Sequence, residues 1–131
     1  IIECLEILEK NEQKFTPQEK TKATYAKKIS KMESKISWQN SAESIVAKIN
    51  ALHPNPGSWL KLNGSRIKII KAKISNKIGK PGEIIDKNFN IGCLENSVQI
   101  LELKKEGKRS MHAEEFLKGN ELKVGSFLDD V

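Results

Sequence analysis

The chain has 131 residues, of which 37% are hydrophobic, 31% charged and 5% aromatic. This length suits about one domain with a modest core, and no apolar run approaches the ~18–20 residues that a membrane helix needs. Ile1 is not a natural start, and no small-residue cleavage site follows it. We therefore interpret the chain as a fragment without a signal peptide, and we expect a cytoplasmic protein with no membrane partner.

The sequence offers little for catalysis. Cys4 and Cys93 are too few for a disulfide scaffold and have no clustered metal ligands near them. A glycine-rich phosphate loop, metal-ligand spacing and a nucleophile constellation are also missing. We therefore expect no catalytic residue, no bound metal and no cofactor within this chain.

Positive charge is concentrated in the middle of the chain, whose formal net charge is +6 overall. Residues 41–90 carry nine basic and three acidic residues, whereas residues 91–131 carry six basic and eight acidic ones. An uneven distribution of this kind is typical of a protein with a polyanionic partner. Lysine makes up 21 of the 23 basic residues, however, so a biased genome composition is an alternative explanation.

The first 38 residues predict a helix, a linker and a basic segment. Residues 1–10 place apolar and acidic side chains on opposite sides of a short helix, and residues 11–23 are polar without periodicity. If residues 24–38 are helical, Lys27, Lys31 and Lys35 share one face with Lys28 beside it. That stripe is either a solvated face or a contact for phosphates.

The rest of the chain predicts a small barrel. Ser41 is a plausible N-cap for a helix that ends at His53-Pro54, and Asn63-Gly64 is a strong hairpin signal. Short strands are expected at 59–62, 66–74, 83–86, 89–94, 98–104 and 124–128, with a short helix at 113–118. The apolar phase shifts within 66–74 and within 98–104, as sharply bent barrel strands require. The predicted fold is mainly β: an OB-like antiparallel barrel with an N-terminal helix and a short extra helix, preceded by a linker.

Four stretches resemble a known family: FTPQEKTKATYAKKISKMESKISW at 15–38, NSAESIVAKINALHPNPGSWLKLNG at 40–64, GKPGEII at 79–85 and GKRSMHAEEFLKG at 107–119. In this order and spacing the chain is similar to the C-terminal domain of the methionyl-tRNA formyltransferase family. The resemblance implies that residues 1–10 are the last helix of a missing catalytic domain, 11–37 the interdomain linker and 38–131 an OB-like tRNA-binding domain.

The resemblance also implies the role of the whole enzyme, which formylates methionine on initiator tRNA with 10-formyltetrahydrofolate as donor. This chain would be inactive alone, and its partners would be initiator methionyl-tRNA and the missing N-terminal catalytic domain. We expect it to be a monomer. The residues that we expect to contact the tRNA backbone are basic: Lys27, Lys28, Lys31, Lys35, Arg66, Lys68, Lys71, Lys73, Lys77, Lys80, Lys108 and Arg109.

Other interpretations stay open at this point. The lysines after residue 65 are equally explained as charges that keep sheet edges from pairing with other chains. Trp38 and Trp59 could stack on bases, but packing in the core or at a domain interface is the simpler role. His53 is expected to cap a helix, and His112 stands where the family often has Ser or Thr. The chain could also belong to a related sugar-nucleotide or folate-dependent formyltransferase with no RNA role, or be a purely structural module.

Overall fold

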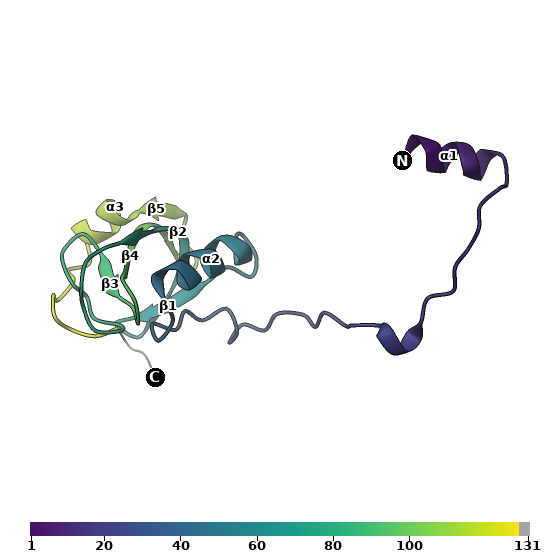
Figure 1. The fold of residues 1–131 in the computed structure, drawn as a ribbon. Coiled ribbons are helices and arrows are strands. Elements are labelled where there is room, and N and C mark those ends of the chain that lie inside the picture. The colour runs from purple at the N-terminus through teal and green to yellow at the C-terminus, as the bar shows by residue number, and fades with distance from the viewer. Residues whose placement is uncertain (129–131) are drawn as a thin grey trace.

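The computed structural model describes residues 1–128 and shows a small β-rich body with a long arm before it (Figure 1). The last three residues of the predicted domain 38–131 lie outside the described part. The elements in chain order are α1 (Ile2–Glu9), the 3-10 turn η1 (Lys20–Lys22), α2 (Ala42–Leu52), β1 (Trp59–Leu62), β2 (Ser65–Ser75), β3 (Asn90–Gly92), β4 (Ser97–Lys105), β5 (Ser110–His112) and α3 (Ala113–Lys118).

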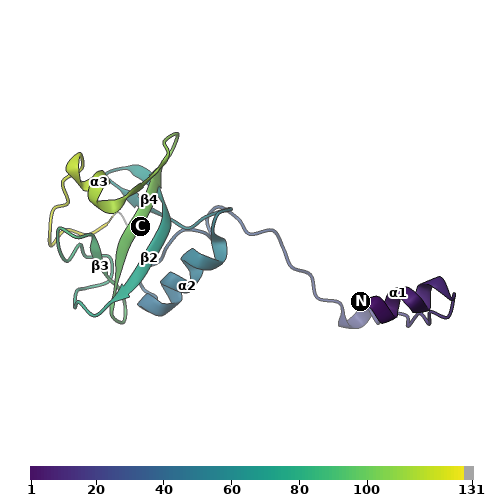
Figure 2. The same cartoon turned by 90° about the horizontal axis from the view of Figure 1, so that it is seen from above.

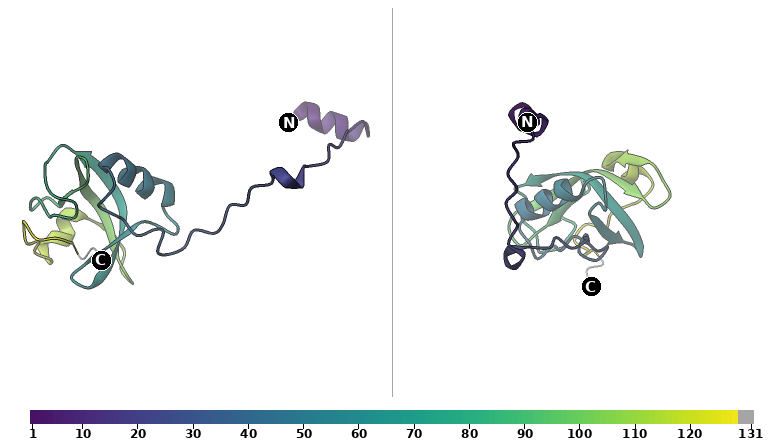
Figure 3. Two further views of the ribbon diagram at one scale, coloured as in Figure 1. Left: turned by 60° about the horizontal axis from the view of Figure 1, so that its bottom comes forward. Right: turned by 90° about the vertical axis from the view of Figure 1, so that its right-hand side faces the viewer.

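The arm contains α1 and η1 and buries none of its side chains. The first buried residue in the chain is Ser34, and Figures 1 and 3 show α1 well away from the barrel at the end of an extended stretch. The helix predicted within residues 1–10 is confirmed. The conditional helix over 24–38 is wrong: this segment is extended up to Ser30, and a turn follows at 31–34.

The sheet is antiparallel throughout, with strand order β1-β2-β4-β3 and β5 paired with β4. The register of β2 against β4 slips twice. Ile69 faces Leu103 and Lys71 faces Glu102, so Ile70 is an extra residue in β2; Ala72 then faces Ile100, so Leu101 is an extra residue in β4. Both predicted phase shifts are thus confirmed. These bulges bend the two long strands that cross the barrel in Figure 2.

Helix α2 covers the open side of the bent sheet. The Ser41 hydroxyl accepts a hydrogen bond from the Ser44 amide at 3.3 Å, as predicted for an N-cap. The helix buries Ala42, Ile45, Ile49 and Leu52 and packs against β2, as Figure 2 shows. The core also contains Trp38, which is 1% exposed.

Two predicted strands are absent as strands, and a third is shorter than expected. Residues 83–86 and 124–128 make only isolated bridges, Ile84 with Ile91 and Glu83 with Phe127, and residues 89–94 shorten to Asn90–Gly92. The backbone of this stretch still bonds to both neighbours, since the Ile85 amide donates to the Asn90 carbonyl at 2.8 Å and the Ile84 amide to the Ser126 carbonyl at 2.9 Å. After Ile85 the chain turns, because the Asp86 carboxylate accepts hydrogen bonds from the amides of Asn88 and Asn90.

The fold class is confirmed as mainly β, an antiparallel sheet curled into a half-barrel with an N-terminal helix and a second short helix, consistent with an OB-like barrel. Among residues 1–128, none of the helices has the length and apolar character to cross a membrane.

Candidate nucleic-acid interface

The C-terminal end of the arm is fixed to the barrel by hydrogen bonds. The Ser30 amide donates to the Glu33 carboxylate at 2.6 Å and the Glu33 amide donates to the Ser30 hydroxyl at 3.2 Å, which closes a turn around Lys31. The Ser30 backbone amide, and after it the Ser30 side chain, hold the pKa of the Glu33 carboxylate below its usual value. The Trp59 indole N–H donates to the Lys31 carbonyl at 2.8 Å. Lys31 is therefore positioned by the barrel, although its side chain is exposed.

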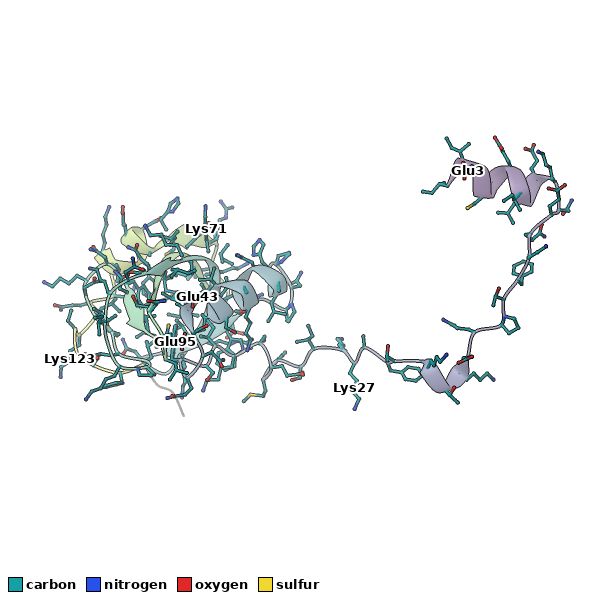
Figure 4. The ribbon with its side chains drawn as sticks, viewed as in Figure 1. Glu3, Lys27, Glu43, Lys71, Glu95 and Lys123 are labelled. Carbon is teal, nitrogen blue, oxygen red and sulfur yellow. The ribbon has the colours of Figure 1, made fainter. Side chains whose placement is uncertain are left out.

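The four predicted lysines of this segment do not share one helical face. Lys27 and Lys28 lie on the exposed, extended arm, and Figure 4 shows Lys27 projecting from it away from the barrel. Lys35 forms a parallel bridge with Trp59, and its ammonium lies 6.0 Å from the centre of the Trp59 ring. Only Lys31 and Lys35 are thus held against the folded body.

The first half of β2 presents two predicted cations on its outer face. The Arg66 guanidinium lies 4.4 Å from the centre of the Trp59 ring, within cation–π range. The Lys68 ammonium is 3.5 Å from the Pro54 carbonyl oxygen, and its stem runs over Gly57. Since a β-carbon on Gly57 would sit 2.7 Å from Lys68 Cδ, the bare backbone at this position gives the lysine its path.

These cations border an open pocket of about 400 Å³ between the end of the arm, β2 and the end of β4. Glu106 is the carboxylate among its lining residues. The complete lining is Lys31, Pro56, Arg66, Lys68, Lys104, Lys105, Glu106 and Gly107, and we call this the basic pocket.

The predicted site residues did not include Lys104 and Lys105, which line the basic pocket. The register places Lys104 directly opposite Lys68 and Lys105 opposite Ile67. The Lys105 ammonium turns away, because it donates to Asn120 at 2.9 Å and lies 5.0 Å from the Phe116 ring centre. Lys104 ends the predicted strand 98–104 and Lys105 follows it, but only the pairing of β4 with β2 reveals that Lys104 joins the other cations.

Beyond the bulge, two of the three predicted cations Lys71, Lys73 and Lys77 have an acidic neighbour. Lys71 lies opposite Glu102, and Figure 4 shows Lys71 on the side of the barrel near β5 and α3, where it lines another open pocket, of about 680 Å³. Lys73 lies opposite the neutral Gln99. Lys77 forms an ion pair with Asp86. Burial would raise the pKa of Asp86, but Lys77, Asn90 and two backbone amides hold it below its usual value.

The remaining predicted cations lie apart from the basic pocket. The Lys80 amide donates to the Glu83 carboxylate at 2.7 Å, in the loop before β3. Lys108 and Arg109 are exposed in the turn between β4 and β5. The structure therefore brings together Lys31, Arg66 and Lys68 of the twelve predicted residues, with Lys35 beside them.

The other candidates have structural roles. Trp38 is in the core, and Trp59 packs between the arm and Arg66. His53 caps α2 through its backbone, and His112 begins α3 without a side-chain cap. Burial raises the pKa of the Cys93 thiol to about 11, which makes it a poor nucleophile. Within residues 1–128, no group of three or more His, Cys, Asp or Glu side chains could hold a metal ion.

The fold and its surface thus define a β half-barrel with a basic pocket where its N-terminal arm attaches. The family model described as "Formyl transferase, C-terminal domain" matches residues 28–121. The chain belongs to this family, and the resemblance noted in the sequence is confirmed.

Its curated relatives are methionyl-tRNA formyltransferases. The protein of that name from Pelagibacter ubique is 39% identical over 132 residues, covering 100% of this chain and 43% of that protein. The one from Bradyrhizobium diazoefficiens is 35% identical over 130 residues, covering 96% of this chain and 42% of that protein. The chain therefore spans less than half the length of these relatives.

A solved structure shares the fold. HypX from Aquifex aeolicus, in complex with tetrahydrofolic acid, matches with a TM-score of 0.70 and 22% identity, covering 99% of this chain and 26% of that chain. At this identity the match shows a common fold.

Proposed function

We propose that the chain is the tRNA-binding C-terminal part of a methionyl-tRNA formyltransferase. The observation that carries the proposal is the basic pocket, since lysine and arginine side chains converge there from the arm, β2 and β4 in a member of this family. Flexible ammonium groups contact backbone phosphates and supply affinity rather than sequence discrimination. The barrel would hold the tRNA while another domain carries out formylation.

In this proposal residues 1–10 pack on an N-terminal catalytic domain, residues 11–37 link the two domains, and residues 38–131 form the tRNA-binding domain. The exposed apolar side chains of α1, Ile2, Leu5 and Leu8, are the face that the catalytic domain would cover. The donor, 10-formyltetrahydrofolate, would bind to the catalytic domain. We propose a cytoplasmic monomer, as expected for a component of translation initiation.

A second candidate is the C-terminal domain of a formyltransferase that does not act on RNA. The observation that favours it is the shared fold with HypX, because the barrel alone does not distinguish the two classes. The two candidates differ in whether the cationic surface of the chain binds RNA.

Binding of the whole chain to initiator methionyl-tRNA, followed by fluorescence anisotropy at about 50 and 200 mM salt, separates the candidates. The tRNA-binding role predicts measurable binding at the lower salt and a steep loss at the higher one. The triple variant with Lys27, Lys28 and Lys31 changed to Ala should bind more weakly. A folded chain without affinity at low salt would contradict the role and favour the second candidate.

A further inference from the structure

The outer face of β2 contains like charges placed directly opposite each other. Lys68 on β2 faces Lys104 on β4, and Arg66 on β2 faces Lys61 on β1. Like charges in direct cross-strand pairs destabilise a sheet. Within residues 1–128, Arg66, Lys68 and Lys104 form no ion pair with a carboxylate, so the sheet itself does not offset this repulsion.

The next cross-strand pair on the same face is different. After the bulge at Ile70, Lys71 of β2 faces Glu102 of β4. The lysine on β2 therefore has a carboxylate opposite it, whereas Lys68 has Lys104 opposite it. The like-charge pairs named above are therefore confined to the part of β2 before the bulge. In the pair Lys68–Lys104 both cations line the basic pocket, so an anion in the pocket can offset their repulsion.

The third side of the pocket is supplied by the arm. The indole N–H of Trp59 fixes the carbonyl of Lys31, and the Trp59 ring lies under Arg66. The same side chain thus anchors one cation and orients another. The cations converge from three segments that are distant in sequence, namely the arm, β2 and β4.

We infer that the basic pocket is a subsite for a backbone phosphate of RNA, held by Lys68 and Lys104 with Arg66 and Lys31 at its rim, and that Trp59 positions the last two. An anion seated between Lys68 and Lys104 relieves their repulsion and accepts charge-assisted hydrogen bonds from both. The pocket is open and lies where the arm meets the barrel, so a continuous strand can cross it. This inference rests on the proposed RNA-binding role and assigns that role to specific residues.

The test compares two pairs of substitutions that remove the same charge. The double variant Lys68→Gln with Lys104→Gln removes two cations of the pocket. The matched control Lys118→Gln with Lys123→Gln removes two exposed cations that are neither in the pocket lining nor among the predicted tRNA contacts. Each variant of the whole chain is titrated with initiator tRNA at several salt concentrations. The pocket pair should bind at least about fivefold more weakly, with the slope of log K against log salt reduced by about one to two, and the control should change by less than about twofold.

Equal losses in the two pairs would overturn the subsite and leave diffuse attraction, while the RNA-binding role would stand. An absence of tRNA binding by the unsubstituted chain would remove the role and the subsite together. Inorganic pyrophosphate provides the second arm of the test. A free polyphosphate that binds the pocket more tightly than tRNA does, and is lost only in the pocket pair, would overturn the assignment to an RNA backbone.

Trp59→Phe tests the positioning step separately. The variant keeps a ring under Arg66 and loses the hydrogen bond to the Lys31 carbonyl. We expect a loss of about threefold in tRNA affinity and a shallower salt slope, which a change in barrel stability alone does not produce. Unchanged affinity and slope would show that Lys31 needs no anchoring and would overturn this step.

Discussion

The two halves of β2 use the same residue type in different ways. Before the bulge at Ile70, Lys68 faces another lysine and has a backbone carbonyl as its nearest polar partner. After the bulge, Lys71 faces Glu102, and beyond the end of the strand Lys77 pairs with Asp86. A lysine-rich strand is therefore not by itself a binding surface, because the residue across the sheet determines whether each cation faces an opposite or a like charge.

The largest expected effect comes from Gly57→Ala, which acts on the first half. Gly57 has a φ of +77°, and an added β-carbon would meet Lys68 Cδ at 2.7 Å. The left-handed backbone should lower the free energy of unfolding by about 1–2 kcal/mol. The clash is relieved at little cost when the flexible end of the Lys68 side chain moves away, so it should displace Lys68 from the pocket and weaken tRNA binding. Urea unfolding and tRNA binding measure the two consequences.

Gly64→Ala is the matched control for Gly57→Ala. Its φ is +73°, but an added β-carbon would meet no atom within 4 Å, so it carries the strain without the clash. Gly64→Ala should lower the free energy of unfolding by about 1 kcal/mol and leave the tRNA affinity unchanged. Equal losses of tRNA affinity at the two glycines would contradict the role given to the Lys68 stem.

Asp86→Asn acts on the second half, where the charge is matched. Asp86 accepts from Lys77, Asn88 and Asn90, so its loss should cost about 1–2 kcal/mol at pH 7. Because the pKa of Asp86 is lowered by folding, its stabilisation is complete above the unfolded value near 3.8 and is lost as the pH falls through the folded value. Thermal unfolding from pH 7 to pH 2 should show the difference between variant and parent shrinking with acid; a constant difference would exclude the ionised form as its source.

A pair of single substitutions compares the two halves directly. Lys104→Gln should raise the free energy of unfolding by about 0.2–1 kcal/mol because it removes a like-charge pair, whereas Lys71→Gln should lower it by a similar amount because it removes an opposite-charge pair. Both effects should fade in high salt. Chemical denaturation at low and high salt measures both effects. Changes of the same sign in the two variants would contradict the proposed difference between the two halves of β2.

The smallest effect is expected from the arm. Deleting residues 1–26 removes α1 and η1 but leaves the Ser30–Glu33 turn, and none of the deleted side chains is buried. The free energy of unfolding should therefore change by less than about 0.5 kcal/mol. A larger loss in denaturant unfolding would show that the arm contributes to the stability of the barrel.

Much of the barrel could be predicted from local sequence. Ser41, Asn63-Gly64 and the phase shift after Ile69 determine structure through neighbouring residues, so each correctly predicted a cap, a turn or a bulge. The strand predicted at 83–86 forms only isolated bridges, because the chain turns at Asp86, whose carboxylate accepts from the amides of Asn88 and Asn90. The apolar residues Ile84 and Ile85 do not reveal that turn.

The candidate site was less predictable for a physical reason. Lys31, Arg66 and Lys68 were found as basic residues, but Lys104 joins them only through the register of β4 on β2. The ion pair between Lys77 and Asp86 likewise depends on how the connection between β2 and β3 folds. The sequence identifies the cations, but only the folded sheet shows whether the residue opposite each cation is acidic or basic.

The most direct test of the basic pocket is a nuclear magnetic resonance titration of the whole chain with initiator tRNA. The two tryptophan indoles report from different places, since the Trp59 N–H is bonded to Lys31 at the pocket and Trp38 is 1% exposed in the core. We predict that the Trp59 indole and the amides of Arg66, Lys68 and Lys104 shift while the Trp38 indole stays in place. Shifts gathered instead around Lys71, Lys73 and His112, with Trp59 unmoved, would contradict the account.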